Sequence, residues 1–481
     1  MTQETELDHK RTPEDLELLL SVEDLKISFV TRSGVIHAIE GVSFLIKHGE
    51  TLGLVGETGC GKSQTAFAIM RLTPPRGLIE QGKIIFSGKD LTKNTVNEMK
   101  IVFRKGHAKL KRNNSALKKM NAEMSKVRGN EISIIFQEPM TSLNPVYKIS
   151  RQISEVLIQH SMEVLVDRII ARNGLSNDQL TSISQRFFES TRTKEQLHVI
   201  LEQENLLPLE DQIWHILDRP DIGQQQKKGE ILQLAEDKVS ASTLRFLQAV
   251  KNAHGRIPSS YRIQDKLPVV RKGYLGVIEK EASTVSFELL SSVRMPNASS
   301  VLNQYPHELS GGMRQRVMIA MAIAAKPKLV IADEPTSALD VTVQAQILEL
   351  LRQLKAASNT SILFISHDMG IIAEICDRVG VMYAGNLVEI GSLNEIFENP
   401  KHPYTQGLLT TIPKYGEKRD TLQTIPGSVP NLMYPPKGCR FIARCKFAFE
   451  KCNEKPLWFE DPESGHGVLC WLYEKNGLKN S

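Results

Sequence analysis

The chain has 481 residues, with 60 Lys and Arg against 55 Asp and Glu, and a formal charge of +5. Hydrophobic residues make up 41% and charged residues 24%, as in an ordinary globular protein, which excludes a disordered tail protein, a collagen-like fibre and a small disulfide scaffold. The length predicts roughly two to four domains. The small positive charge does not by itself indicate binding to nucleic acid.

No stretch of the sequence is long and apolar enough to span a bilayer. The first twenty residues are polar and rich in Asp and Glu, and they lack the basic start and apolar run of a secretory signal. We therefore expect the chain to stay in the cytosol. In that compartment its six cysteines are expected as thiols or metal ligands rather than as disulfides.

The first predicted elements are two strands, over 25–30 and 42–46, with a turn at 32–34 between them. A third apolar run over 50–55 reads as a buried strand. It ends in a glycine-rich loop, which a helical pattern over 62–70 follows. A strand, a glycine-rich loop and a helix in this order open a nucleotide-binding α/β domain.

The glycine-rich loop matches the pattern G-x-x-x-x-G-K-[ST] in full. In such a loop backbone N–H groups surround the β-phosphate of ATP, the lysine reaches the β and γ oxygens, and the last hydroxyl ligates Mg²⁺. A glycine turn that fits the pattern by chance is the alternative, and the strand and helix around the loop argue against it. The expected ATP-binding residues are Gly56, Glu57, Thr58, Gly59, Cys60, Gly61, Lys62 and Ser63.

A further predicted strand, over 328–332, is followed by two acids, Asp333 and Glu334. Such strand ends often have a purely structural role. Together with a phosphate loop, however, they suit phosphoryl chemistry, with Asp333 holding the Mg²⁺ shell and Glu334 accepting a proton from the attacking water.

The segment Leu-Ser-Gly-Gly-Met-Arg-Gln-Arg over 309–316 resembles the signature sequence of ATP-binding-cassette (ABC) ATPases, and the other family motifs occur in the family's order. Gln137 follows a strand, as the glutamine loop does, and His367 follows a strand where the family has its switch histidine. Phe29 lies where the family places an aromatic ring against adenine. Alone, these three would pass for a loop glutamine, a strand-end histidine and a core aromatic.

The resemblance implies an α/β fold, in which a P-loop ABC-type nucleotide-binding domain carries a helical subdomain. Two such domains are expected to pair head to tail with ATP between them. Ser310, Gly311 and Gly312 would then face the ATP held by the partner domain. The catalytic set implied for this chain's own nucleotide is Glu334, His367 and Gln137, and the set implied for Mg²⁺ is Ser63, Gln137 and Asp333.

Three further stretches, 137–145, 338–346 and 402–405, resemble the ATPase subunits of oligopeptide/dipeptide importers, a family that includes nickel importers. The resemblance implies an ABC ATPase domain over 21–400 and an importer-type C-terminal tail over 401–481. Two insertions outside the resemblance interrupt the first of these, at about 100–128 and about 160–277.

Four cysteines in the tail, Cys439, Cys445, Cys452 and Cys470, are spaced C-x5-C-x6-C-x17-C. Four thiolates that converge in space can bind a [4Fe–4S] cluster, and the family resemblance favours that reading. Tetrahedral zinc is the alternative, although its usual closely spaced cysteine pairs are missing. Buried free thiols rank third.

Neither insertion has an assigned role. The basic segment is dense in Lys and Arg and could contact anionic lipid or RNA, but a solvated helical arm is the preferred interpretation. The longer segment shows helical patterns, including an apolar face at Val239, Phe246, Leu247 and Val250. It is either a tolerated surface excursion or a module for regulation or partner binding.

The sequence thus predicts the ATP-hydrolysing motor of a peptide importer, peripheral to the cytoplasmic face of the cell membrane. Its expected partners are a second ABC ATPase subunit, preferably a paralogue, two transmembrane permease subunits and, indirectly, an extracellular substrate-binding protein. Nickel or another small solute is the alternative cargo. The rival function is a soluble ABC ATPase acting on nucleic acid or ribosomes, but no nucleic-acid partner is expected, because the chain has one cassette and no sustained heptad pattern.

Overall fold

The computed structural model describes residues 18–104, 107–190, 192–219, 221–235, 238–258, 268–337, 339–411, 425–474 and 479–480. The acidic leader, residues 1–17, lies outside the described residues, and so does position 338 in the loop after the second acid. The chain forms two compact units, one of Met1–Gln137 with Lys326–Ser481 and the other of Glu138–Ala325.

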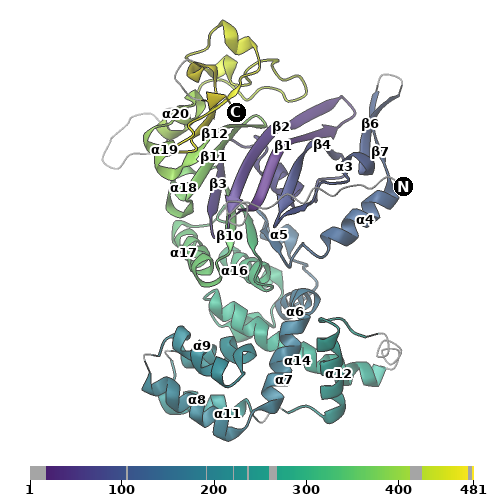
Figure 1. Ribbon diagram of the computed structural model, residues 1–481, viewed down its shortest axis with the longest axis vertical. Helices are drawn as coiled ribbons and strands as arrows, with labels where there is room; N and C mark the ends of the chain where they lie inside the picture. The colour runs from purple at the N-terminus through teal and green to yellow at the C-terminus, as the bar shows by residue number, and fades with distance from the viewer. Residues whose placement is uncertain are drawn as a thin grey trace, which may run out of the picture. The chain divides into compact units, whose positions relative to one another are not determined.

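A nine-stranded sheet forms the centre of the first unit, in the order β15-β13-β14-β12-β11-β3-β10-β9-β8 (Figure 1). The strands from β8 to β11 in this order run parallel, and the rest pair antiparallel. Residues of β3, β9 and β10 are buried throughout, as expected for parallel strands covered on both faces. The strands are β3 (Thr51–Val55), β8 (Ile132–Ile135), β9 (Leu329–Asp333), β10 (Ser361–Ser366), β11 (Arg378–Tyr383), β12 (Asn386–Ser392), β13 (Trp458–Glu460), β14 (Gly467–Leu469) and β15 (Lys479–Asn480).

A four-stranded antiparallel sheet, β2-β1-β4-β5, contributes to the same hydrophobic core. Leu25 and Ile39 from this sheet belong to one buried cluster with Leu54 and Ile331 from the nine-stranded sheet. The two predicted N-terminal strands are confirmed and are longer than expected, because each begins seven residues before the predicted start, at Leu18 and Val35. The strands are β1 (Leu18–Val30), β2 (Val35–Lys47), β4 (Gly77–Phe86) and β5 (Lys89–Asp90).

The predicted helix after the glycine-rich loop is confirmed as α2 (Lys62–Ile69). Of the further helices of the first unit, α17, α18 and α19 each follow a strand of the nine-stranded sheet, whereas α3 follows β5 and α4 follows the hairpin described below. Asp340 caps the longest of them, because its carboxylate accepts a hydrogen bond from Val343 N at 2.9 Å. These helices are α3 (Thr95–Glu98), α4 (Asn114–Met124), α17 (Val341–Ser358), α18 (Met369–Ile375), α19 (Leu393–Glu398) and α20 (Pro403–Thr410).

The basic segment is not the solvated helical arm that the sequence suggested. Its first half is a hairpin of β6 (Met99–Arg104) and β7 (His107–Arg112), and in β7 the apolar Leu110 stands between Lys109 and Lys111. Only its second half is helical, as α4, and Met124 at the end of that helix lies in the main core with Val127. The high density of Lys and Arg hid a strand alternation and a buried helix end.

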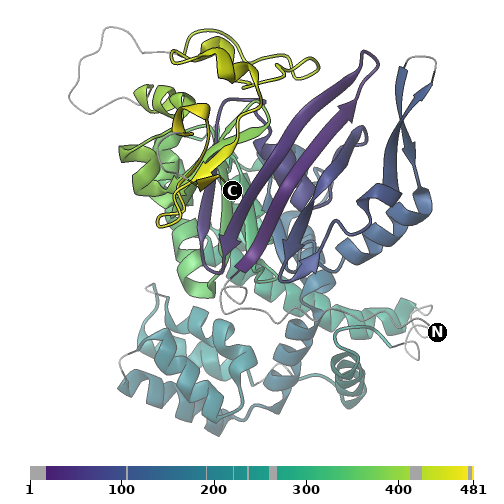
Figure 2. The ribbon, with the colours of Figure 1, turned by 45° about the horizontal axis from the view of Figure 1, so that its top comes forward.

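The C-terminal tail is joined to the cassette through the sheet itself. Strand β14 pairs with β12 through Val468 and Gly467, and β13 pairs with β14 (Figure 2, yellow). A small core of Cys452, Phe459, Val468 and Trp471 holds the tail together. Cys452 lies in a short 3-10 helix, Glu450–Asn453. Cys445 directly follows a second one, Ile442–Arg444, and Cys470 directly precedes a third, Trp471–Tyr473.

The second unit is helical in its described residues, as predicted for 160–277. Helices α8 to α11 enclose a hydrophobic core of their own, which includes Leu180, Leu201 and Ile213. Within the described part of the chain, no helix is both long and apolar enough to cross a membrane. The helices are α5 (Pro139–Ser142), α6 (Ile149–His160), α7 (Met162–Gly174), α8 (Asn177–Glu189), α9 (Lys194–Gln203), α10 (Glu210–Leu217), α11 (Gln224–Gln233), α12 (Ala241–Asn252), α14 (Pro268–Ser292), α15 (Ala298–Val301) and α16 (Gly311–Ile323).

Candidate active site

The glycine-rich loop connects β3 to the N-terminus of α2, as predicted. Gly56 has φ 155°, and a Cβ atom there would lie 2.1 Å from the carbonyl oxygen of Met382, so only glycine fits. At Gly59, φ 83°, a Cβ atom would meet nothing within 4 Å, and Thr58 beside it is exposed. The top of the loop is therefore open to a ligand, and its base is packed against β11.

Two side chains at the start of α2 connect the loop to its surroundings. Lys62 is buried, and its ammonium group donates to the carbonyl oxygen of Gly56 at 2.7 Å. The hydroxyl of Ser63 donates to Asp333 Oδ1 at 3.0 Å. The structure thus brings together the loop serine and the acid at the end of β9, which are two of the three predicted Mg²⁺ ligands.

Asp333 lies at the end of β9 and is 3% exposed. Burial raises the pKa of its carboxyl to about 6, against the lowering effect of the Ser63 hydrogen bond, and the neighbouring Glu334 charge raises it further. A divalent cation between Ser63 and Asp333 would favour the ionised carboxylate, and oxygen ligands of this kind are the ones that Mg²⁺ prefers.

Glu334 is the meeting point of the other predicted catalytic residues. Gln137, after β8, donates from Nε2 to Glu334 Oε2 at 2.8 Å, and His367 Nδ1, after β10, lies 3.3 Å from Glu334 Oε1. The backbone of Glu334 has φ 47°, and its N–H donates to the carbonyl oxygen of Ile365. Non-glycine residues held in this conformation are often functional, and here it aims the carboxylate between the ends of β8 and β10.

The structure places Phe29 and the signature residues on two separate elements. Phe29, near the end of β1, is half-buried and packs against Gly77, where a Cβ atom would lie 2.9 Å from the ring. In the second unit Ser310 is the N-cap of α16 and accepts from Met313 N at 3.3 Å, and Gly311 and Gly312 form the first turn. Contact of Phe29 with adenine, and of the signature with a partner's ATP, remain predictions.

Two residues of the C-terminal region contact the phosphate loop, and no sequence pattern indicates these contacts. Arg444 makes two hydrogen bonds to the carboxylate of Glu57, and the hydroxyl of Tyr404 accepts from Glu57 N at 3.0 Å. Tyr404 lies in the His-Pro-Tyr motif that was noted for family resemblance alone. Arg444 precedes Cys445, and no local pattern relates it to a residue so far back in the chain.

The four tail cysteines line one cavity of about 10 Å³, together with residues that include Phe441 and Trp471. Burial, followed by the neighbouring thiols, raises the pKa of Cys470 to about 12; burial also raises that of Cys439, to about 11. A cavity of this size holds about one water molecule, far less than a four-iron cluster. Among the described residues, no three His, Cys, Asp or Glu side chains are arranged to hold a metal ion, so the structure does not support the predicted cluster or zinc.

The two remaining cysteines are buried, as predicted for Cys376. Cys376 Sγ lies beside β3, where a Cβ atom on Gly53 would be 2.8 Å from it. Burial raises the pKa of the Cys60 thiol, although Lys62 close by opposes that shift. Cys60 therefore contributes its backbone to the phosphate loop rather than a reactive thiolate.

Comparison with known proteins gives the following similarities. Residues 39–337 match the family model described as "ABC transporter", and residues 388–452 match "Oligopeptide/dipeptide transporter, C-terminal region". The chain is 37% identical to the oligopeptide transport ATP-binding protein OppD of Haemophilus influenzae, over 94% of this chain and 97% of that protein. It is 36% identical to OppD of Bacillus subtilis, over 96% and 90%, and 32% identical to the dipeptide transport ATP-binding protein DppD of Bacillus subtilis, over 96% of each chain.

Proposed function

The chain belongs to the ABC transporter family, and we propose that it is the ATP-hydrolysing subunit of a membrane importer of oligopeptides or dipeptides. Family membership implies ATP hydrolysis coupled to transport, with ATP and Mg²⁺ as the expected ligands. The observation that carries the proposal is the joint placement of Gln137, Glu334 and His367 beside the Ser63–Asp333 pair. The match of 388–452 to the oligopeptide/dipeptide transporter region supports peptide as the cargo class.

In this proposal the phosphate loop binds the nucleotide. Its backbone N–H groups and the N-terminus of α2 surround the β-phosphate, and Lys62 exchanges its bond to the Gly56 carbonyl for the phosphate oxygens. Mg²⁺, when bound, neutralises charge on the β and γ oxygens. Ser63 and Asp333, with Gln137, are the residues that would hold it.

Hydrolysis itself needs a water molecule activated next to the γ-phosphate. Glu334 is the proposed acceptor of the water proton, and Gln137 and His367 hold its two carboxylate oxygens in place. His367 is 58% exposed, so its ring can turn from Glu334 towards a nucleotide. Phe29 is the proposed contact for adenine.

A second cassette completes the proposed site. Ser310, Gly311 and Gly312 offer a capped helix N-terminus, which suits the charge of a γ-phosphate bound by a partner cassette. We infer that the partner is a paralogous ATPase subunit, and that the pair acts on two transmembrane permease subunits from the cytoplasmic face of the cell membrane. A substrate-binding protein outside the cell would deliver the peptide. Nickel or another small solute is the second candidate cargo.

The tail cysteines remain a candidate site for a [4Fe–4S] cluster, or for zinc. What supports this is that Cys439, Cys445, Cys452 and Cys470 surround one cavity, although that cavity would have to open to admit a cluster. Metal analysis of protein purified without oxygen tests it. About four iron atoms per chain would support the cluster, and about one zinc atom would support zinc; the absence of both metals would mean that the four cysteines are free thiols.

Affinity purification from detergent-solubilised membranes tests the importer function. We expect two multi-span proteins and a second cassette to travel with the chain, and ATP hydrolysis that the Lys62→Ala variant abolishes. Recovery only from the soluble fraction, with ribosomal proteins or nucleic acid, would favour the rival function. The substrate-binding protein that works with the purified complex can then be screened against dipeptides, oligopeptides and Ni²⁺.

A further inference from the structure

The phosphate loop contains a carboxylate, at Glu57, although the loop is expected to bind several negatively charged phosphates. Glu57 is the second residue of the loop, and its side chain is 29% exposed. An unpaired carboxylate this close to a phosphate site would repel the ligand, and the repulsion is stronger where the protein partly excludes water. The position therefore needs a compensating positive charge from outside the loop.

Arg444 of the C-terminal tail supplies that charge. Its Nη1 donates to Glu57 Oε2 at 2.9 Å and its Nη2 donates to Glu57 Oε1 at 3.0 Å, so the guanidinium and the carboxylate form a bidentate pair. The guanidinium is 5% exposed. Burial alone would lower the pKa of Arg444, but the hydrogen bonds to Glu57 and Tyr383 raise it above its ordinary range, so the charge is permanent.

Further hydrogen bonds within the first unit hold the Arg444 guanidinium in place. Nε donates to the carbonyl oxygen of Pro426 at 3.1 Å, and Nη2 also donates to that of Ile425 at 3.1 Å. The hydroxyl of Tyr383, at the end of β11, accepts a further hydrogen bond from Nη1 at 3.3 Å. Since all these partners belong to the first unit, the arginine forms a clamp between the tail and the phosphate loop.

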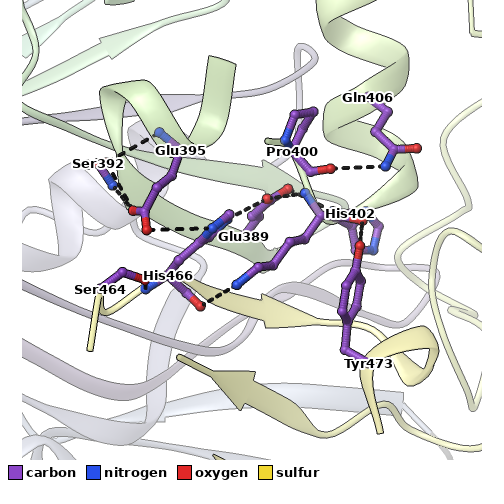
Figure 3. A network of polar contacts seen from close by, with 10 residues as sticks. Glu389, Ser392, Glu395, Pro400, His402, Gln406, Ser464, His466 and Tyr473 are labelled. Atoms are coloured by element: carbon purple, nitrogen blue, oxygen red, sulfur yellow. Dashed lines mark hydrogen bonds and ion pairs between the residues drawn. The ribbon is translucent and has the colours of Figure 1, made fainter. Parts of the chain in front are cut away.

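The tail in turn is anchored to the cassette by a buried polar network around Glu389 of β12 (Figure 3). Glu389 is fully buried, and it accepts from His402 N at 2.9 Å and from His466 Nε2 at 2.8 Å. His402 Nδ1 accepts a hydrogen bond from Tyr404 N at 3.1 Å. The hydroxyl of Tyr404 in turn accepts a hydrogen bond from the backbone N–H of Glu57. The tail thus holds Glu57 by its carboxylate and, through Tyr404, by its backbone.

We propose that Arg444 is a positioning residue for ATP binding, because it neutralises Glu57 and fixes the first turn of the phosphate loop. The proposal rests on the nucleotide site proposed above and extends it, since it gives the C-terminal tail a direct part in nucleotide affinity. The competing explanation is that the Arg444–Glu57 pair only attaches the tail.

The two explanations differ in a double-variant test on the full-length protein. ATP affinity is measured by calorimetric titration, and KM and kcat for ATP hydrolysis are measured in the same preparations. Arg444→Gln leaves the Glu57 charge uncompensated, so we expect ATP to bind roughly tenfold more weakly, with KM affected more than kcat. In the Glu57→Gln background the charge to be compensated is gone, so the double variant should bind ATP within about threefold of Glu57→Gln alone.

Arg440→Gln is the matched control. Arg440 is a second buried arginine of the tail, and it binds the carbonyl oxygen of Ala384 and the carboxylate of Glu40 rather than Glu57. Arg440→Gln should lower the midpoint temperature of thermal unfolding but should not weaken ATP binding. Arg444→Lys keeps the charge but not the bidentate geometry, so we expect it to bind ATP with an intermediate affinity. It takes the place of Arg444→Gln in the test if Arg444→Gln fails to fold.

Two results would overturn the proposal while leaving the nucleotide site intact: ATP affinity unchanged in both Arg444 variants, or a weakened affinity that Glu57→Gln does not restore. The second result would make Arg444 an anchor of the tail. If the unchanged protein does not bind ATP at all, the proposed nucleotide site fails and this proposal fails with it.

Discussion

Gln137 Nε2 lies 2.8 Å from Glu334 Oε2, so the residue that follows β8 and the acid that follows β9 share a hydrogen bond across the edge of the parallel sheet. The carboxyl ends of parallel strands converge at one edge, which places Ser63, Asp333 and His367 there as well. The two proposed roles, proton acceptance and cation binding, thereby fall to two adjacent acids with different surroundings.

Glu334→Gln tests the proton-accepting role. The amide keeps the size of the side chain and a hydrogen-bonding oxygen, but it cannot take a proton from water. We expect ATP hydrolysis to fall roughly 100-fold or more while ATP affinity changes less than about threefold. Glu349→Gln on the exposed face of α17 is the control and should leave both unchanged. Equal losses of binding and hydrolysis would mean that Glu334 only supports the fold.

Asp333 should make the stability of the nucleotide-free protein depend on pH. Its pKa is about 6 in the folded protein and 3.8 as a free side chain, so folding favours the protonated form. The contribution to stability is complete below pH 3.8 and is lost as the pH rises through 6. Asp333→Asn removes the buried charge, and at pH 7.5 it should raise the free energy of unfolding by up to about 3 kcal/mol.

Urea unfolding at two pH values measures this effect. The gain from Asp333→Asn should shrink at pH 5, where the native Asp333 is already largely protonated. The same variant should lose Mg²⁺-dependent hydrolysis at every pH, because the amide is a weaker cation ligand. If Asp333→Asn raised the free energy of unfolding equally at both pH values, the buried charge of Asp333 would not be the cause of the gain.

Glu389 should be important for attachment of the tail. Glu389→Gln replaces one acceptor oxygen by an N–H group that faces either a backbone N–H or His466, and no water reaches the site. A buried donor left without an acceptor costs about 1–3 kcal/mol, so we expect a loss of about that size. Hydrogen exchange should rise in β14 and in the first turn of α20. Exchange confined to other parts of the first unit would contradict the anchoring role.

The sequence predicted the local parts of the site and missed those that join distant segments. Gly56 to Ser63, and the acids after β9, follow fixed local spacings, so their pattern can be identified without a structure. The hairpin at Met99–Arg112 was missed because its many Lys and Arg residues, such as Lys109 and Lys111 on either side of Leu110, resemble a solvated helix. The Arg444–Glu57 pair spans 387 positions, and no spacing rule connects an arginine next to a cysteine with a phosphate loop.

Glu281 offers a test of the helical unit that is separate from ATP chemistry. It is 1% exposed in α14 and pairs with Arg168 Nε at 2.9 Å and with Arg172, both from α7. Arg168 also binds Glu288, so loss of Glu281 would leave Arg172 as the less compensated of the two buried cations. Breaking one member of a buried ion network is far more destabilising than breaking an exposed pair.

We therefore expect Glu281→Gln to lower the free energy of unfolding of the second unit by about 3 kcal/mol, with faster hydrogen exchange in α7 and α14. Glu204→Gln is the matched control, because Glu204 pairs with Arg186 at 3.3 Å in the same unit but both side chains are partly exposed. Its effect should stay below about 1 kcal/mol. Because the nucleotide-contacting residues of the first unit are unchanged, Glu281→Gln should leave ATP affinity within about threefold. A stability loss no larger than that of the control would mean that the arginines find other partners or water.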